Sequence, residues 1–145
     1  MNAPAIFQLG LVSMFLGQPD AAIPAIENAM RLNPHDPAGE AYYWSLGTCY
    51  LLSGRLNELM INLLRKACSA NPRMFYHHLS LAGALGLMGD LDDAKAAVAE
   101  AIKLRPEVNS LARIRAQFPW GNPQFWSLFE NTVAAGLRRA GFPDE

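Results

Sequence analysis

The residues of this 145-residue chain that could take part in chemistry are three histidines, two cysteines and a short acidic run: His35, His77, His78, Cys49, Cys68, Asp90, Asp92 and Asp93. Neighbouring residues on a helix point about 100° apart, so His77 and His78 cannot easily face one metal ion. Three aspartates could open a calcium-binding loop, but no later acidic residue completes it. We therefore expect no metal site.

The two cysteines have neither the spacing nor the partners that reactive thiols need. Cys49 and Cys68 form no CxxC pair, and neither has a spaced histidine and acid that would indicate a nucleophile. The chain contains no GxxxxGK[ST] or GxSxG motif, and residues 83–86 lie inside a helical pattern rather than after a strand. We expect no cofactor and no catalysis by this chain, and a reduced, cytoplasmic protein.

Composition excludes several classes of protein. Apolar residues make up 51% of the chain and charged residues 17%, with a net charge of -1. This apolar content is too high for intrinsic disorder, and the balanced charge gives no general attraction to a nucleic-acid backbone. No apolar run is long enough to span a membrane, and no basic residue precedes the apolar start of the chain as in a signal peptide.

The chain contains an internal repeat, which positions everything else. Three segments end alike, with an alanine five residues before a proline: 29–34, 67–72 and 101–106. The prolines recur at intervals of 38 and 34 residues, and the longer interval contains a Pro- and Gly-rich linker at 35–39. A glycine stands in the middle of each unit, namely Gly17, Gly54 and Gly89. Insertions in linkers cost little, so the unequal intervals are compatible with one repeated unit.

The pattern resembles the tetratricopeptide repeat, a helix-turn-helix unit of about 34 residues. The residues that carry the resemblance are Leu9, Gly10, Gly17, Ala22, Ile26, Ala29 and Pro34, then Tyr43, Leu46, Gly47, Tyr50, Gly54, Leu64, Ala67 and Pro72, then Leu81, Ala82, Leu85, Gly89, Ala94, Val98, Ala101 and Pro106. The resemblance implies an all-α, right-handed helical solenoid in one domain, with repeats at about 3–36, 40–73 and 75–108.

Residues 109–145 fit no fourth repeat. A short helix is expected at 110–118, then a break, then a final helix at 124–140. Trp126, Phe129, Val133 and Leu137 recur at intervals of three and four, which gives that helix one apolar stripe. A solenoid needs an end unit that is apolar toward the last repeat and polar outward, so we predict C-terminal capping helices.

In proteins of this family the first helix of each pair lines a concave groove that holds partners. By that resemblance the groove residues here are Phe7, Leu11, Phe15, Trp44, Thr48, Leu51, Tyr76, Leu79 and Leu87. The groove carries none of the Lys, Arg and Asn side chains that clamp acidic chaperone tails, so we predict an apolar or amphipathic protein partner. The alternative is that neighbouring repeats or the chain's own tail cover these residues.

The first predicted helix is apolar on nearly every side. Ile6, Phe7, Leu9, Leu11, Val12, Met14, Phe15 and Leu16 all fall within it. Such a helix needs cover all round, yet no polar cap precedes it. Two explanations stay open: the chain is a fragment whose upstream repeats are missing, or two copies form a homodimer through this helix.

The chain's ending, residues 136–145, and its linker 32–37 resemble those of alphaproteobacterial signalling proteins. In these proteins a class III adenylate or guanylate cyclase domain, or a winged-helix DNA-binding domain, precedes C-terminal tetratricopeptide repeats. The sequence therefore predicts a regulatory or oligomerising interaction module. The alternative is the regulatory C-terminal segment of a nucleotide cyclase whose catalytic domain is absent from this chain.

Overall fold

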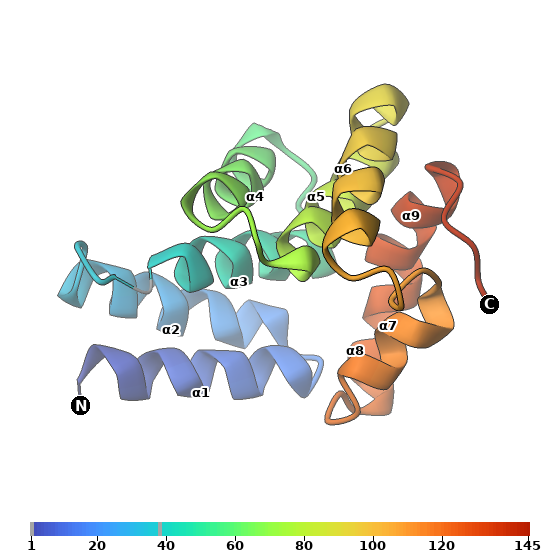
Figure 1. The fold of residues 1–145 in the computed structure, drawn as a ribbon. Helices are drawn as coiled ribbons and strands as arrows, with labels where there is room; N and C mark the ends of the chain where they lie inside the picture. The colour runs from blue at the N-terminus through green and yellow to red at the C-terminus, as the bar shows by residue number, and fades with distance from the viewer. Residues whose placement is uncertain (1, 38) are drawn as a thin grey trace.

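The computed structural model describes residues 2–37 and 39–145, and its regular elements are all helices (Figure 1). Ala38 of the predicted linker lies outside the described residues. Three antiparallel pairs follow one another along the chain, which confirms the predicted helical solenoid. The pairs are α1 (Ala3–Phe15) with α2 (Pro19–Leu32), α3 (Gly39–Leu52) with α4 (Glu58–Ala70), and α5 (Phe75–Leu87) with α6 (Leu91–Leu104).

Each pair turns at a glycine. Gly17, Gly54 and Gly89 have φ values of 78°, 78° and 84°, a left-handed backbone that residues with a β-carbon rarely adopt. The next residue's N–H then returns to the helix, as when Gln18 donates to the carbonyl of Ser13 at 2.9 Å. The repeated glycine therefore marks the turn between the two helices of each pair.

The two helices of a pair approach closely at a small residue. A β-carbon on Gly10 would lie 2.8 Å from Cγ1 of Ile26, and one on Gly47 would lie 2.9 Å from Cδ2 of Leu64. Ala82, at the equivalent position of the third pair, is fully buried. The cost of glycine inside a helix is offset here by this close packing.

The second helices of the pairs begin in different ways. Pro19 occupies the first turn of α2, and Asp20 also lies in that turn, where its charge favours the helix dipole. Asp90 stands at the start of α6, but its side chain makes no capping hydrogen bond. At the start of α4, by contrast, the side chain of Asn57 does cap the helix, because its Oδ1 accepts from the N–H of Met60 at 3.0 Å.

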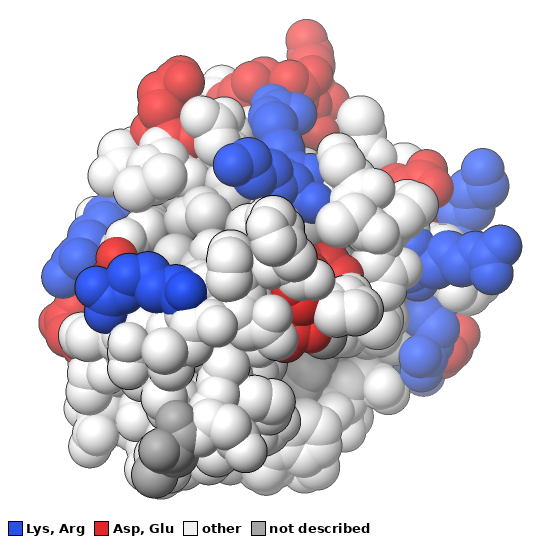
Figure 2. Space-filling view, turned by 90° about the vertical axis from the view of Figure 1, so that its left-hand side faces the viewer, with Lys and Arg blue, Asp and Glu red and all other residues white. Residues whose placement is uncertain are grey.

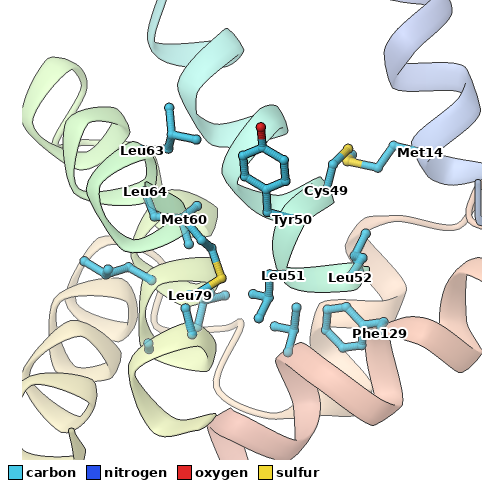
Figure 3. Close-up of a cluster of buried hydrophobic side chains, with 14 of the residues drawn as sticks. Met14, Cys49, Tyr50, Leu51, Leu52, Met60, Leu63, Leu64, Leu79 and Phe129 are labelled. Carbon is cyan, nitrogen blue, oxygen red and sulfur yellow. The ribbon is translucent and has the colours of Figure 1, made fainter. Parts of the chain in front are cut away.

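The core is shared by all three pairs and by the C-terminal helices. Figure 3 shows side chains from α1, α3, α4, α5 and the C-terminal segment in one buried cluster. Helix α3 is central, because it is buried along most of its length from Ser45 to Leu52. None of the helices in the described residues is long and apolar enough to cross a membrane.

The C-terminal segment is helical where the sequence predicts it, and it also contains a π-helical turn that was not predicted. The elements are α7 (Leu111–Gln117), α8 (Pro123–Phe129), a π-helical turn η1 (Glu130–Ala134) and α9 (Ala135–Arg139). The last three form one continuous helical segment that crosses the ends of α1 and α3 and then lies against α5 (Figure 1). This segment therefore contacts more of the array than the last repeat.

Candidate partner-binding groove

The first helices of the three pairs bring five of the nine predicted groove residues to one place. Phe15, Trp44, Thr48, Tyr76 and Leu79 line a cavity of about 40 Å³. That volume holds about one water molecule. The groove is therefore present as a surface but is almost completely filled.

The other predicted groove residues lie apart from this cavity. The ring of Phe7 packs edge-on against Tyr42 at 4.5 Å, near the amino-terminal end of α1. Leu11 lines a separate recess, Leu51 is fully buried in the core, and Leu87 is half-buried at the end of α5.

The chain's own C-terminal helices form the opposite wall of the cavity. The chain's own tail therefore covers the predicted groove, which is one of the alternatives that the sequence leaves open. The wall is made by Ile114, Phe118, Phe125, Trp126, Phe129 and Val133.

Aromatic rings join the two walls. The ring of Phe15 lies 5.1 Å from that of Phe125 and 6.2 Å from that of Phe118. Phe118 in turn meets Tyr76 edge-on at 6.1 Å, and Tyr76 meets Trp44 at 4.8 Å. Since each such pair contributes about 0.5–1.5 kcal/mol beyond area burial, the segment is held firmly.

Polar contacts hold the segment at both ends. At its start, the backbone N–H of Asn122 donates to the carbonyl of Phe15 at 3.2 Å, and its Nδ2 donates to the carbonyl of Leu16 at 3.0 Å. At its end, Nη1 of Arg139 donates to the carbonyl of Leu87 at 3.2 Å. These bonds tie the segment to the first and third pairs.

A crossing of glycines brings α9 against α5. A β-carbon on Gly83 would lie 2.9 Å from the carbonyl oxygen of Val133, and one on Gly86 would overlap the carbonyl oxygen of Gly136. The helical pattern of residues 83–86 excludes a phosphate loop, but it did not predict this close contact. The signal was the i, i+3 spacing of two glycines on one helix face, which allows another backbone to approach.

The lining of the groove is apolar and uncharged. It contains no Lys, Arg, Asp or Glu. Nε1 of Trp44 donates to Oγ of Ser80 at 3.0 Å, and Oγ1 of Thr48 lies 3.4 Å from the same oxygen. The polar atoms of the wall thus bond to one another, and the remaining surface is apolar.

His77 is buried directly behind the groove and is neutral. Burial lowers the pKa of His77 to about 4. Its Nδ1 lies 3.3 Å from the carbonyl oxygen of Ala67, which can only accept, so the proton is on Nδ1. Its Nε2 lies 3.6 Å from Oε2 of Glu40, beyond hydrogen-bonding distance.

The other candidates for chemistry are also inert. Burial raises the pKa of Cys49 to about 12 and that of Cys68 to about 11, so both are protonated thiols. His78 has its Nε2 2.9 Å from the carbonyl oxygen of Pro72. Among the described residues, no three His, Cys, Asp or Glu side chains are placed to hold a metal ion.

An open apolar surface lies on the outer side of α1. Leu9, Val12 and Leu16 are exposed there, beside the exposed ring of Trp120. The first charged residue of the chain is Asp20, and Figure 2, which looks at the molecule from the amino-terminal end of α1, shows no Lys, Arg, Asp or Glu in its lowest part, where α1 lies. Val12, Leu16 and Trp120 line a shallow recess of about 440 Å³ together with Gln8, Leu11 and Phe15.

Several solved structures share this arrangement of helices. YrrB, a TPR protein with an unusual peptide-binding site, is 20% identical with a TM-score of 0.64 over 81% of this chain and 57% of its own. MamA is 19% identical with a TM-score of 0.67, over 96% of this chain and 76% of its own. The Yersinia enterocolitica chaperone SycD, solved with a peptide of the translocator YopD, is 17% identical with a TM-score of 0.63, over 95% and 91%.

The sequence itself matches a known family. The comparison with curated proteins finds no match. Tetratricopeptide repeat profiles match residues 7–72 and 78–108, which together are more than half of the chain. These matches cover the three helix pairs, and the chain belongs to the tetratricopeptide repeat family.

Proposed function

We propose that this chain is a protein-interaction module whose concave groove binds an amphipathic helix with aromatic residues on one face. The groove is apolar, uncharged and lined by rings, which suits helix-in-groove recognition. Its role in the cell is regulatory or oligomerising rather than catalytic.

One observation carries the proposal: a helix of this type already lies in the groove. Phe125, Phe129 and Val133 stand at successive intervals of four and present one face to Trp44 and Tyr76. The chain's own segment therefore supplies a working example of the ligand. A partner helix with the same pattern would compete with it for the groove.

The inert side chains support a non-catalytic role. The cysteines are free thiols with raised pKa values, and the pKa of His77 is lowered by burial. Free thiols suit the reducing cytoplasm in which we place the protein. YrrB is described as having a peptide-binding site and SycD was solved with a peptide, and a peptide or protein partner for this chain is the corresponding proposal. The relation to nucleotide cyclases stays a prediction from the sequence.

A peptide of residues 122–140 tests the proposal. The variant Gly136→Val places a larger side chain against α5 and is expected to release the segment from the groove. Calorimetric titration should show saturable binding of the peptide to this variant and little binding to the wild-type chain, whose groove is filled. Adding Trp44→Glu should abolish binding.

Two controls keep the test decisive. If Gly136→Val unfolds, the double variant Asn122→Ala and Arg139→Ala removes the end contacts and leaves the packed core intact. An acidic peptide of equal length should not bind either variant. Tight binding of the acidic peptide, or no binding of the 122–140 peptide to a folded released variant, would sink the proposal.

A further inference from the structure

The first helices of the three pairs, α1, α3 and α5, each have an equivalent apolar face, and only on α1 is this face uncovered. Leu9, Leu46 and Leu81 occupy equivalent positions, each one residue before the small residue that contacts the second helix of its own pair. Leu46 and Leu81 are 5% and 7% exposed, whereas Leu9 is 53% exposed. A leucine that is buried in two copies is therefore open in the third.

The next turn of the helix repeats this difference. Val12, Cys49 and Ala84 are equivalent, three residues beyond the leucines and on the same face. Cys49 and Ala84 are fully buried, and Val12 is 54% exposed. The whole face is thus open on α1.

The covered copies show what kind of element lies on this face. Helix α2 packs against α3, and α4 packs against α5. When α2 and α4 are aligned on Pro34 and Pro72, the positions that lie near the leucine of the following helix are the same in both. They are Glu27, Met30 and Arg31 near Leu46, and Arg65, Cys68 and Ser69 near Leu81.

We propose that the face of α1 formed by Leu9 and Val12 docks the second helix of a separate helix-turn-helix unit. The occupant is amphipathic, with a medium-sized apolar residue where Met30 and Cys68 stand and polar residues beside it. Its docking continues the array by one unit at the α1 edge, where Figure 1 shows no element beyond α1 among the described residues.

A second copy of this chain fits the face less well. Helices α2 and α4 are already covered by α3 and α5, and at the other edge of the array α9 lies against α5 and only touches α6. Pairing α1 with α1 of another copy would set a first helix on a first helix, a contact unlike either covered face. The surface also lies outside the filled groove, so this inference does not depend on the proposed function.

An extended chain tests the inference, with an added helix pair joined at the same spacing as that between α4 and α5. A duplicate of residues 39–74 is joined directly to Ala3, because Ala3 is equivalent to Phe75. The added copy of α4 then precedes α1 as α4 precedes α5. In the chain as it stands, Leu9→Glu should change Tm by no more than about 2 °C, since surface substitutions cost little.

In the extended chain the same substitution should lower Tm by about 10 °C, because it would bury a charge under the added helix. Leu59→Glu is the matched control, since Leu59 is also 53% exposed but lies on α4, and it should have a small effect in both chains. An equal effect of Leu9→Glu in the two chains would overturn the inference.

Alkylation of a Val12→Cys variant gives a second measurement that does not depend on melting. The added thiol should react at least about tenfold more slowly in the extended chain than in the unextended one, because its position would be covered. Equal rates would contradict the inference. Light scattering of the unextended chain addresses the other occupant: a dimer that Leu9→Glu dissociates would assign the face to a second copy and overturn the proposal.

Discussion

The carbonyl oxygen of Gly136 occupies the place that a β-carbon on Gly86 would take. This contact joins two helices that are separated by 50 positions in the chain, and it fixes how α9 crosses α5. The crossing in turn sets which residues of α8 reach the concave face. This pair of glycines therefore lets α9 lie directly against α5, next to the part of the segment that fills the groove.

Substitution of either glycine by alanine should destabilise the protein. We expect Gly86→Ala to lower the free energy of unfolding by about 1–3 kcal/mol, because the added methyl group forces two backbones apart. Gly39→Ala is the control, since a β-carbon there would meet no other part of the described chain within 4 Å and helical alanine is favoured. Urea denaturation measures both, and equal midpoints for the two variants would contradict the crossing.

Acid should weaken the fold through His77. Its pKa is about 4 in the folded chain and 6.5 in the unfolded one, so the unfolded chain binds more protons between these values. The free energy of unfolding should therefore fall as pH decreases from 6.5 to 4, by roughly 3 kcal/mol at most. The carboxylate of Glu40 nearby reduces this loss.

The comparison with His77→Gln isolates this contribution, because glutamine keeps a donor for the carbonyl of Ala67 but does not titrate. Chemical denaturation at a series of pH values should show a steeper decline for the wild-type chain. Parallel curves would mean that His77 does not titrate in this range.

The last residues should protect the start of α7. The N–H groups of Leu111 and Ala112 donate to the carbonyls of Pro143 and Asp144, both at 2.9 Å. Removing residues 143–145 should speed amide hydrogen exchange at Leu111 and Ala112, because the first N–H groups of a helix have no partner within it. The amide of Arg113 is the internal control, since Oγ of Ser110 accepts from it. Unchanged exchange at all three amides would contradict this contact.

The thiols should be unreactive in the folded protein. At about pH 8 we expect Cys68 to react with a disulfide reagent much more slowly than a free thiol, because its pKa is about 11. Cys49, with a pKa of about 12, should react only on unfolding. A kinetic assay with and without denaturant checks both. Rapid reaction of either cysteine under native conditions would place it in a different environment.

The repeated part of the fold could be predicted because its signals are local. Gly17 and its two equivalents mark turns, and Gly10 and Gly47 mark close approaches to a helix 16 and 17 positions further along the chain. These features depend on residues within one unit. The family matches and the helix boundaries confirm them.

The filling of the groove could not be predicted in the same way. The stripe Phe129, Val133 and Leu137 predicts an amphipathic helix but does not say which surface it covers. That choice depends on contacts between distant parts of the chain, such as Asn122 with Leu16 and Gly136 with Gly86. The π-helical turn at 130–134 changes the register between them, and no local sequence signal indicated it.

The C-terminal segment also changes the mechanics of the array. In an open solenoid each pair contacts only its neighbours, so the array bends when each pair rotates slightly against the next. Here one helical segment is bonded to α1 at Asn122 and to α5 at Arg139, so it spans the first and third pairs like a strut. Bending of the array would stretch these bonds, and the curvature of the three pairs is therefore fixed as long as the segment stays in place.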